Sequence, residues 1–155
     1  MLELNHRERG KVVVECIDLR RTLGEGETAV EVLKGLNLKI HQGEFCSIVG
    51  PSGSGKSTLM YLLGALDRPD SGQVLIDGHD TRRMKDLELA ELRNRKLGFI
   101  FQFHYLMPEF TALENVMMPM YKRGVAHSDA KERAHSLLAE MGIGNKTHRP
   151  PGKLS

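Results

Sequence analysis

The chain has 155 residues, of which 27% are charged and 40% hydrophobic, and its formal net charge is +2. This composition supports a folded domain with a core of its own and excludes the disordered class. The apolar runs are too short to cross a membrane, and so small an excess of positive charge gives no reason to expect nucleic acid as a partner.

The first part of the chain predicts strands and then a helix. Segments 11–19 and 30–40 have the apolar pattern of strands, and Gly24 and Gly26 predict a turn between them. The short apolar run 44–49, EFCSIV, stops at Gly50 and is typical of a strand buried on both faces. We then expect, in chain order, a buried helix at 56–66, a strand at 73–76, a surface helix at 83–96 with Met84, Leu87 and Ala90 inward, and a strand at 97–102. Both cysteines, Cys16 and Cys46, lie in strand-like runs, which predicts buried free thiols in a reducing compartment.

The last third of the chain predicts helices. Thr111 and Glu114 have the spacing of a capping box, and apolar residues follow on one helical face, at Leu113, Val116, Met117 and Met120. Pro119 should kink this helix or end it. We expect Ser128 to cap a further helix and Gly142 to stop it. Strands followed by a glycine loop and a helix indicate an α/β layered fold, on which the block from Thr111 forms a helical subdomain.

The glycine-rich segment GPSGSGKST, residues 50–58, is the motif that points to a chemistry. It fits G-x-x-x-x-G-K-[ST], a pattern that chance gives to a chain of this composition about once in a hundred. Glycines let backbone N–H groups converge on a phosphate, and a helix that starts there directs its partial positive end to the same point. Lys56 would then reach the β- and γ-phosphates, Ser57 would bind Mg²⁺ and Thr58 would contact the α-phosphate. The candidate nucleotide-binding residues are Gly50, Pro51, Ser52, Gly53, Ser54, Gly55, Lys56, Ser57 and Thr58; the alternative is a glycine turn that binds nothing.

Other patterns in the chain indicate no second site. Residues 24–29 fit the dinucleotide pattern G-x-G-x-x-[GA], but a strand-like segment follows, and Glu25 and Glu27 would repel a pyrophosphate, so we expect a hairpin turn. The histidines and cysteines show no metal-ligand spacing. A GTPase is disfavoured because segment 145–148 lacks the Asp of N-K-x-D, and a small-molecule kinase because no arginine-rich lid follows the loop.

The runs LKGLNLKI, FCSIVGPSGSGKSTLMYLLGALDRPDSGQVLIDG and LGFIFQ, taken in order, resemble the nucleotide-binding domain of ATP-binding cassette (ABC) transporters. The resemblance covers residues 10–155. It implies a P-loop NTPase fold of the ABC type, in which a β-rich N-terminal part and the P-loop core occupy about 10–102, and the Q-loop and a helical subdomain about 103–150.

The chain stops at Leu154-Ser155, where the LSGGQ signature of this family would begin. We therefore interpret residues 1–155 as an N-terminal fragment of an ABC-type ATPase whose C-terminal remainder is missing. The resemblance places the rest of the signature, the Walker B Asp, the catalytic Glu and the switch His in that remainder, so the fragment would hold no catalytic residue and be inactive alone. It should also fold poorly, because segment 44–49 would have an unpaired edge and a bare apolar face.

Ligands also follow from the resemblance. The chain would bind ATP and Mg²⁺, with Gln102 as the Q-loop glutamine that senses Mg²⁺ together with Ser57. Leu23 takes the position of the aromatic residue that stacks on adenine in the family, and would replace ring stacking with a plain apolar contact.

The implied partners are transmembrane permease subunits, docking near Gln102–Tyr121, and a second copy of the ATP-binding subunit, with no nucleic acid. Phe103, Leu106, Met107 and the methionines at 117, 118 and 120 would line the docking surface, or alternatively belong to the subdomain core. The location implied is peripheral, at the cytoplasmic face of the bacterial inner membrane.

Within the family, segments 91–119 and 148–155 most resemble the ATPases of lipoprotein-releasing systems. The expected function is therefore to couple Mg-ATP binding and hydrolysis to lipoprotein release or a related export process. Efflux-type and cell-division-type ABC ATPases share parts of these segments. A non-catalytic, truncated nucleotide-binding or scaffold protein is the alternative from another class.

Overall fold

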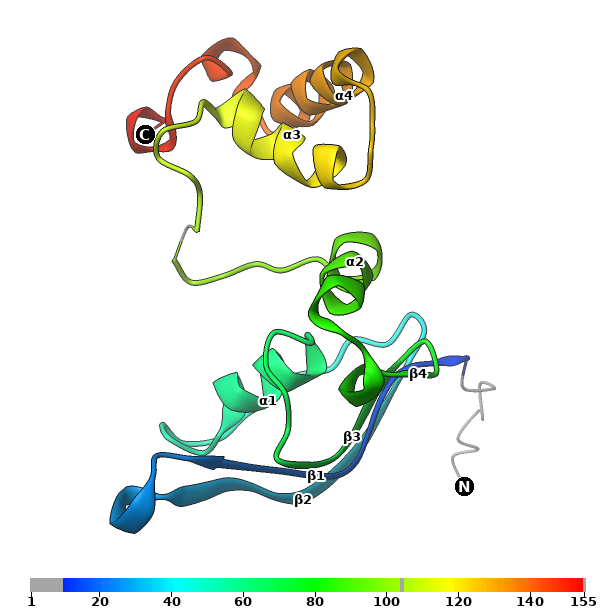
Figure 1. Ribbon diagram of the computed structural model, residues 1–155. Helices are drawn as coiled ribbons and strands as arrows, with labels where there is room; N and C mark the ends of the chain where they lie inside the picture. Colours follow the sequence, from blue (N-terminus) through cyan, green and yellow to red (C-terminus); the bar gives the residue numbers. More distant parts are fainter. Residues whose placement is uncertain (1–9, 104, 155) are drawn as a thin grey trace, which may run out of the picture. The chain divides into compact units, whose positions relative to one another are not determined.

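Two long antiparallel strands, β1 (Val12–Leu23) and β2 (Val30–His41), begin the fold (Figure 1). Figure 1 is a computed structural model of the chain, and it describes residues 10–103 and 105–154. The two strands pair from Val12 with His41 to Leu23 with Val30. The connection holds a single 3₁₀ turn, Gly26–Thr28. The hairpin predicted for the acidic glycine segment is thus confirmed.

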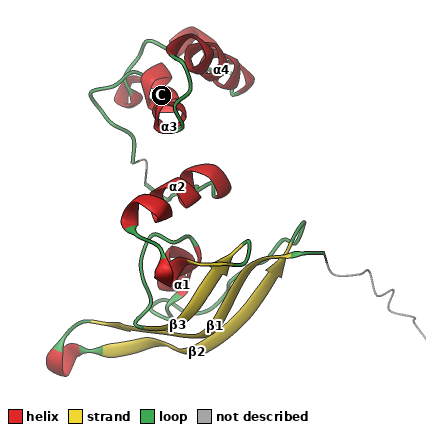
Figure 2. Cartoon of the chain, turned by 45° about the vertical axis from the view of Figure 1, so that its right-hand side comes forward, coloured by secondary structure: helices red, strands yellow, loops and turns green. Residues whose placement is uncertain are grey.

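The hairpin belongs to a four-stranded antiparallel sheet with the order β2-β1-β3-β4, where β3 is Ser71–Ile76 and β4 is His79–Asp80. Helix α1 (Lys56–Leu63) lies on one face of this sheet (Figure 2). The core of this part combines side chains of the sheet with one face of the helix; they are Cys16, Leu19, Leu33, Leu59, Leu62, Leu63, Val74 and Ile76. This core is what fixes the start of α1, and with it the glycine-rich loop, against β2.

Two predicted strands are absent from the described part of the chain. Segment 44–49 has no strand pairing, and Phe45 and Val49 are 95% and 85% exposed. Segment 97–102 is likewise irregular, and Ile100 is fully exposed. A strand that is apolar on both faces is stable only between neighbouring strands and covering layers, and none of the four paired strands borders either segment. The same exposure makes the prediction of a buried Cys46 wrong, whereas Cys16 is a buried free thiol as predicted.

The chain divides into two compact units, Met1–Arg93 and Asn94–Ser155, and α2 (Asp86–Lys96) ends across this boundary. The second unit contains α3 (Ala112–Lys122), α4 (His127–Glu140) and two 3₁₀ turns, Gly144–Lys146 and Pro151–Lys153. The buried residues Met117, Ala130 and Ala134 form its small core. Within residues 10–103 and 105–154, no helix has both the length and the apolar character needed to cross a membrane.

The start of α3 satisfies its free backbone donors unusually well. Thr111 and Glu114 form the predicted capping box, in which the Thr111 hydroxyl accepts from the Glu114 N–H and the Glu114 carboxylate accepts from the Thr111 N–H. The next donors are taken by carbonyls from the end of the chain, because Ala112 N–H donates to Arg149 and Leu113 N–H to Thr147. The first turn of α3 is therefore tied to the segment at 147–149, near the end of the second unit.

Three details of the predicted helices need correction. Pro119 was predicted to kink helix α3 or to end it, and it does not end it, because the helix continues to Lys122. Helix α4 begins at His127 with Ala126 as its N-cap residue, so Ser128 lies inside the helix and does not cap it. The Ser128 hydroxyl donates to the Asp129 carboxylate instead. Helix α2 begins at Asp86 rather than at 83; its buried residue is Leu89, and Leu87, predicted inward, is 77% exposed. Gly142 follows α4 with a φ of 75°, as its predicted role as a helix stop requires.

Candidate functional site

The loop at 50–55 joins the irregular segment 44–49 to α1, and glycine conformations shape it. Gly53 and Gly55 have φ angles of 78° and 85°, in the left-handed region that favours glycine. Gly55 is also the residue from which α1 begins, and a Cβ atom there would lie 3.1 Å from the Val32 carbonyl oxygen. Only glycine meets both demands without displacing β2, so this residue lets the helix start directly against the sheet.

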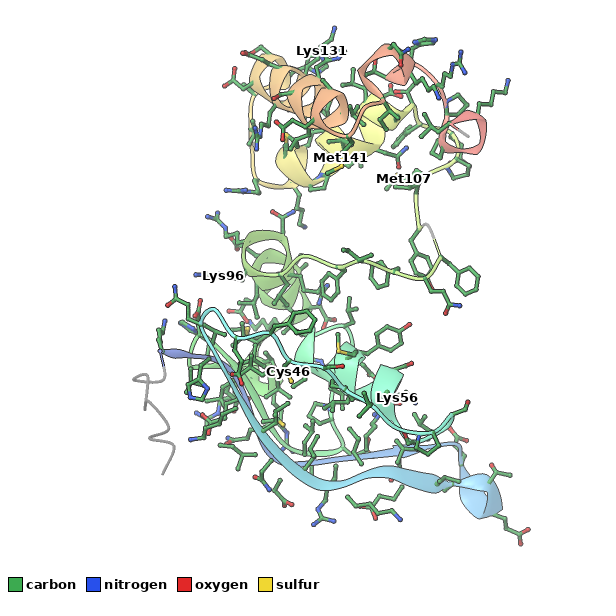
Figure 3. All side chains as sticks on the ribbon, turned by 180° about the vertical axis from the view of Figure 1, so that it is seen from behind. Cys46, Lys56, Lys96, Met107, Lys131 and Met141 are labelled. Atoms are coloured by element: carbon green, nitrogen blue, oxygen red, sulfur yellow. The ribbon has the colours of Figure 1, made fainter. Side chains whose placement is uncertain are left out.

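Lys56 closes the loop from inside. Its Nζ donates to the carbonyl oxygens of Gly50, at 2.9 Å, and of Pro51, at 2.6 Å. Figure 3 labels Lys56 among the side chains. The Ser54 hydroxyl lies at 3.5 Å, a long third contact. An ammonium group has three donors, so two carbonyl bonds fix its position, and the third donor makes only the long contact with Ser54. The sequence thus places a fixed positive charge beside the first turn of the helix.

The first turn of α1 has donors without helical partners. The helix has no side-chain cap, and the first backbone bond along it runs from the Leu59 N–H to the Gly55 carbonyl. The N–H groups of residues 56–58 therefore lack an acceptor within the helix, and they carry the positive end of its dipole. With Lys56, this arrangement can hold a compact, multiply charged anion such as a polyphosphate.

The start of α1 can bind a magnesium ion only when a phosphate supplies further oxygen ligands. Among the residues that the structure describes, no group of three or more His, Cys, Asp or Glu side chains is placed to hold a metal ion. The hydroxyl of Ser57, on the first turn of α1, is an oxygen ligand of the kind that Mg²⁺ accepts, and Mg²⁺ in such sites takes its other oxygens from phosphates and water. The residues present thus fit a magnesium–nucleotide complex better than a resident metal.

A cavity of about 530 Å³ borders the loop. The loop contributes Gly50, Pro51, Ser54, Gly55 and Lys56 to its lining, and the rest comes from β2, the preceding segment and α1: Val32, Leu33, Lys34, Gly35, Leu36, Ile48, Val49 and Leu59. The wall beyond the loop is mainly aliphatic. Such a lining suits apolar packing. Apart from Lys34 on β2, the polar side chains of the lining belong to the loop itself.

The predicted site residues fall into three places. Residues 50–58 are together in the loop and the first turn of α1. Leu23 belongs to the same unit but lies at the end of β1, 43% exposed, and does not line the cavity at the loop. Gln102 belongs to the second unit, in an exposed irregular segment. The roles of Leu23 and Gln102 therefore stay predictions.

Sequence reasoning missed an ion-pair network beside the loop helix. Arg21 on β1 donates to Asp67 at 2.7 Å and to Asp70 at 2.8 Å, and the Thr22 N–H donates to the other oxygen of Asp70 at 2.6 Å. The Thr22 amide, followed by the Arg21 guanidinium, lowers the pKa of the Asp70 carboxyl below its ordinary value. The only signal in the sequence was the phrase D-x-P-x-S-G at 67–72, because the arginine stands more than 40 residues earlier.

A second missed residue lies in the other unit. The Asn115 side chain makes four hydrogen bonds to backbone atoms of the preceding turn: its Oδ1 accepts from Met107 N–H, and its Nδ2 donates to the carbonyls of Met107, Phe110 and Thr111. One side chain thus closes the turn between the Gln102 segment and α3. A lone Asn inside a helical pattern gives no sign of this role.

A glycine loop closed by a lysine, opening a helix that packs on a sheet, defines a P-loop protein of the α/β class. More particularly, the chain belongs to the ABC transporter family, because the model of that family, described as "ABC transporter", matches residues 33–155. A solved relative, titled a dimeric structure of a post-hydrolysis state of the ATP-binding cassette MJ0796 bound to ADP and Pi, superimposes with a TM-score of 0.83 at 40% identity. That match covers 92% of this chain and 63% of the other.

Curated relatives show which members of the family this chain resembles. The lipoprotein-releasing system ATP-binding protein LolD of Geobacter metallireducens is 52% identical over 92% of this chain and 64% of its own length. The protein of the same name from Aquifex aeolicus is 56% identical over 81% of this chain and 56% of its own length. An uncharacterized ABC transporter ATP-binding protein of Thermotoga maritima is 48% identical over 94% of this chain and 62% of its own. The chain thus spans about three fifths of the length of the curated relatives that it matches.

Proposed function

We propose that this chain is the nucleotide-binding part of an ABC-type ATPase subunit, and that Gly50–Thr58 hold the phosphates of Mg-ATP. The geometry of the loop carries the proposal: Lys56 is fixed by two loop carbonyls beside helix donors that have no intrahelical acceptor. The solved cassette that resembles the chain was bound to ADP and Pi, which supports the choice of an adenine nucleotide.

The residues of the loop would act by binding and orienting the phosphates. Backbone N–H groups of the loop and the first turn hold the phosphate oxygens, and Lys56 offsets the negative charge that grows on them during transfer. When bound, Mg²⁺ would neutralise part of the phosphate charge. The Ser57 hydroxyl is the proposed ligand from the protein, and Gln102 is the proposed sensor of the ion. We propose that residues 50–58 bind the phosphates and that the whole ATPase subunit hydrolyses ATP.

The proposed process is lipoprotein release, or a related export process, because relatives named LolD match the chain at 52% and 56% identity. A second copy of the subunit is the proposed partner in the ATPase, since the solved cassette is dimeric. Permease subunits would dock near Gln102–Tyr121, where apolar side chains are exposed: Phe103 is 67%, Leu106 47% and Met107 43% exposed. The proposed location is the cytoplasmic face of the bacterial inner membrane, with about 10–102 as the P-loop core and about 103–150 as the Q-loop and helical subdomain.

Titration with Mg-ATP tests the nucleotide proposal. Lys56→Ala should weaken binding by at least about tenfold, because it removes the charge and the bridge across the loop. Lys39→Ala is the matched control, since Lys39 is a lysine on β2 whose ammonium pairs with Glu15 at 3.0 Å. The proposal fails if the parent protein does not bind Mg-ATP, or if the two variants bind it equally well.

Crosslinking in cells tests the docking part. A photoreactive amino acid at Leu106 should yield adducts with an integral membrane protein. The same group at Leu87, which is exposed on α2, is the control and should yield none. Equal adducts from both positions, or from neither, would contradict a docking surface at the Gln102 segment.

A further inference from the structure

Arg21 lies at the centre of a compact polar clamp, which we define as Arg21, Asp67 and Asp70. The two arms of its guanidinium each bind one carboxylate, at 2.7 and 2.8 Å. The remaining oxygens are also used, since Asp67 accepts from the Arg68 N–H at 2.7 Å and Asp70 from the Thr22 N–H at 2.6 Å. Two charge-assisted bonds on a planar fork give this clamp a single geometry.

The clamp joins two elements that are far apart in sequence. Arg21 is two residues before Leu23, at the end of β1. Asp67 and Asp70 lie just after α1, in a segment held to the last turn of that helix, because the N–H groups of Leu66 and Asp67 both donate to the Tyr61 carbonyl. A backbone bond of 3.1 Å from the Asp70 N–H to the Arg20 carbonyl adds to the link. The clamp therefore fixes the far end of the helix that begins at the loop to the end of β1.

We propose that Arg21 is a positioning residue for nucleotide selectivity, which sets the distance between the end of β1, where Leu23 is predicted to contact the base, and the phosphate-binding start of α1. This inference rests on the proposed function. A nucleotide whose phosphates bind at the start of α1 gains affinity from a base contact at the end of β1 only if the protein already holds these two sites at the right separation. The phosphate contacts are made by the loop alone, so they do not depend on this separation.

The clamp could instead serve stability alone, and the two roles predict different results. A purely structural clamp would change the affinities for ATP and for a bare polyphosphate by the same factor, through the folded fraction. A positioning clamp would lower only the affinity that includes the base. The ratio of the two dissociation constants is therefore the informative readout.

The experiment uses the purified gene product with Mg²⁺ and two probes, ATP and inorganic tripolyphosphate. Arg21→Ala should raise the Kd for ATP about fivefold to tenfold and that for tripolyphosphate less than about twofold, as expected for loss of one apolar base contact. Arg21→Lys should fall between, since it keeps the charge and loses the fork. Arg20→Ala is the matched control, because this neighbouring arginine pairs with Asp18 and Glu31, each at 3.2 Å, and it should change neither constant.

Two outcomes would overturn the inference. The first is that both Arg21 variants change the two dissociation constants by the same factor, and the second is a parent protein that binds ATP no more tightly than tripolyphosphate. If Arg21→Ala does not fold, Asp70→Asn removes one arm of the clamp and gives the same ratio. Failure of the proposed function itself looks different, because the parent protein would then bind neither probe.

Discussion

Gly72, inside β3, and Gly78, in the turn after this strand, allow a test of how closely β1 approaches β3. Gly72 and Gly78 have nearly the same φ, 83° and 82°, but different surroundings. A Cβ atom at Gly78 would have nothing within 4 Å, whereas at Gly72 it would lie 2.6 Å from the Ile17 carbonyl oxygen and closer still to that of Asp18. The pair therefore separates the cost of the backbone conformation from the cost of crowding.

The expected magnitudes follow from these surroundings. Gly78→Ala should cost about 1 kcal/mol of unfolding free energy, the penalty of a left-handed alanine less the entropy that alanine removes from the unfolded chain. Gly72→Ala adds a backbone clash that only separation of β1 from β3 relieves. Losing two ladder bonds at about 1 kcal/mol each, with overpacking of a similar size, brings the total to about 3–4 kcal/mol.

Urea unfolding followed by far-ultraviolet circular dichroism measures both variants against the parent chain. The midpoint should fall slightly for Gly78→Ala and much further for Gly72→Ala, at a similar slope. Equal destabilisation by the two substitutions would refute the reasoning, because it would mean that β1 does not approach Gly72 as closely as the structure has it.

Three further expectations concern other parts of the chain. Cys46 should react rapidly with a thiol reagent while Cys16 reacts only on unfolding, since burial raises the pKa of the Cys16 thiol and shields it; equal rates would contradict this. The fold lowers the pKa of the Asp70 carboxyl. Its contribution to the unfolding free energy is therefore complete above the ordinary pKa of an Asp carboxyl and is lost as the pH falls through the lower pKa of the folded state. Asp70→Asn should flatten the acid side of a curve of unfolding free energy against pH, below about pH 4. Asn115→Ala should speed hydrogen exchange at the Met107 amide and leave α4 protected, and an unchanged Met107 rate would exclude the role of this side chain in closing the turn.

The sequence was sufficient where the structure depends on local spacing. Thr111 and Glu114 are three residues apart, and the capping box that they predict is present. The same holds for the glycine loop, because Gly55 and Lys56 stand next to the helix that they open. The family and its fold also followed from these runs and the segments around them.

Prediction failed where the deciding partner is distant in the chain or outside the described residues. The apolar run 44–49 has the pattern of a central strand, but that pattern depends on neighbours, and the described residues provide none. Arg21 looks like an ordinary solvated charge until the fold brings Asp67 and Asp70 to it. Ser128 has the right residue type for a cap, yet α4 starts earlier, where the Ala126 carbonyl accepts from the Ala130 N–H. Ser155, half of the expected start of the signature, lies outside the described residues.

The two carbonyls that complete the first turn of α3 also bear on how the second unit folds. Ala112 and Leu113 receive their acceptors from Arg149 and Thr147, so the bonds close a loop of about 40 residues, and the entropy lost in closing it grows only with the logarithm of that length. The capping box and the two bonds that close this loop all lie between Thr111 and Arg149. Because short-range topology speeds folding, we expect these helices to assemble on their own timescale, ahead of a sheet whose strand β1 must find β3 some 60 residues later.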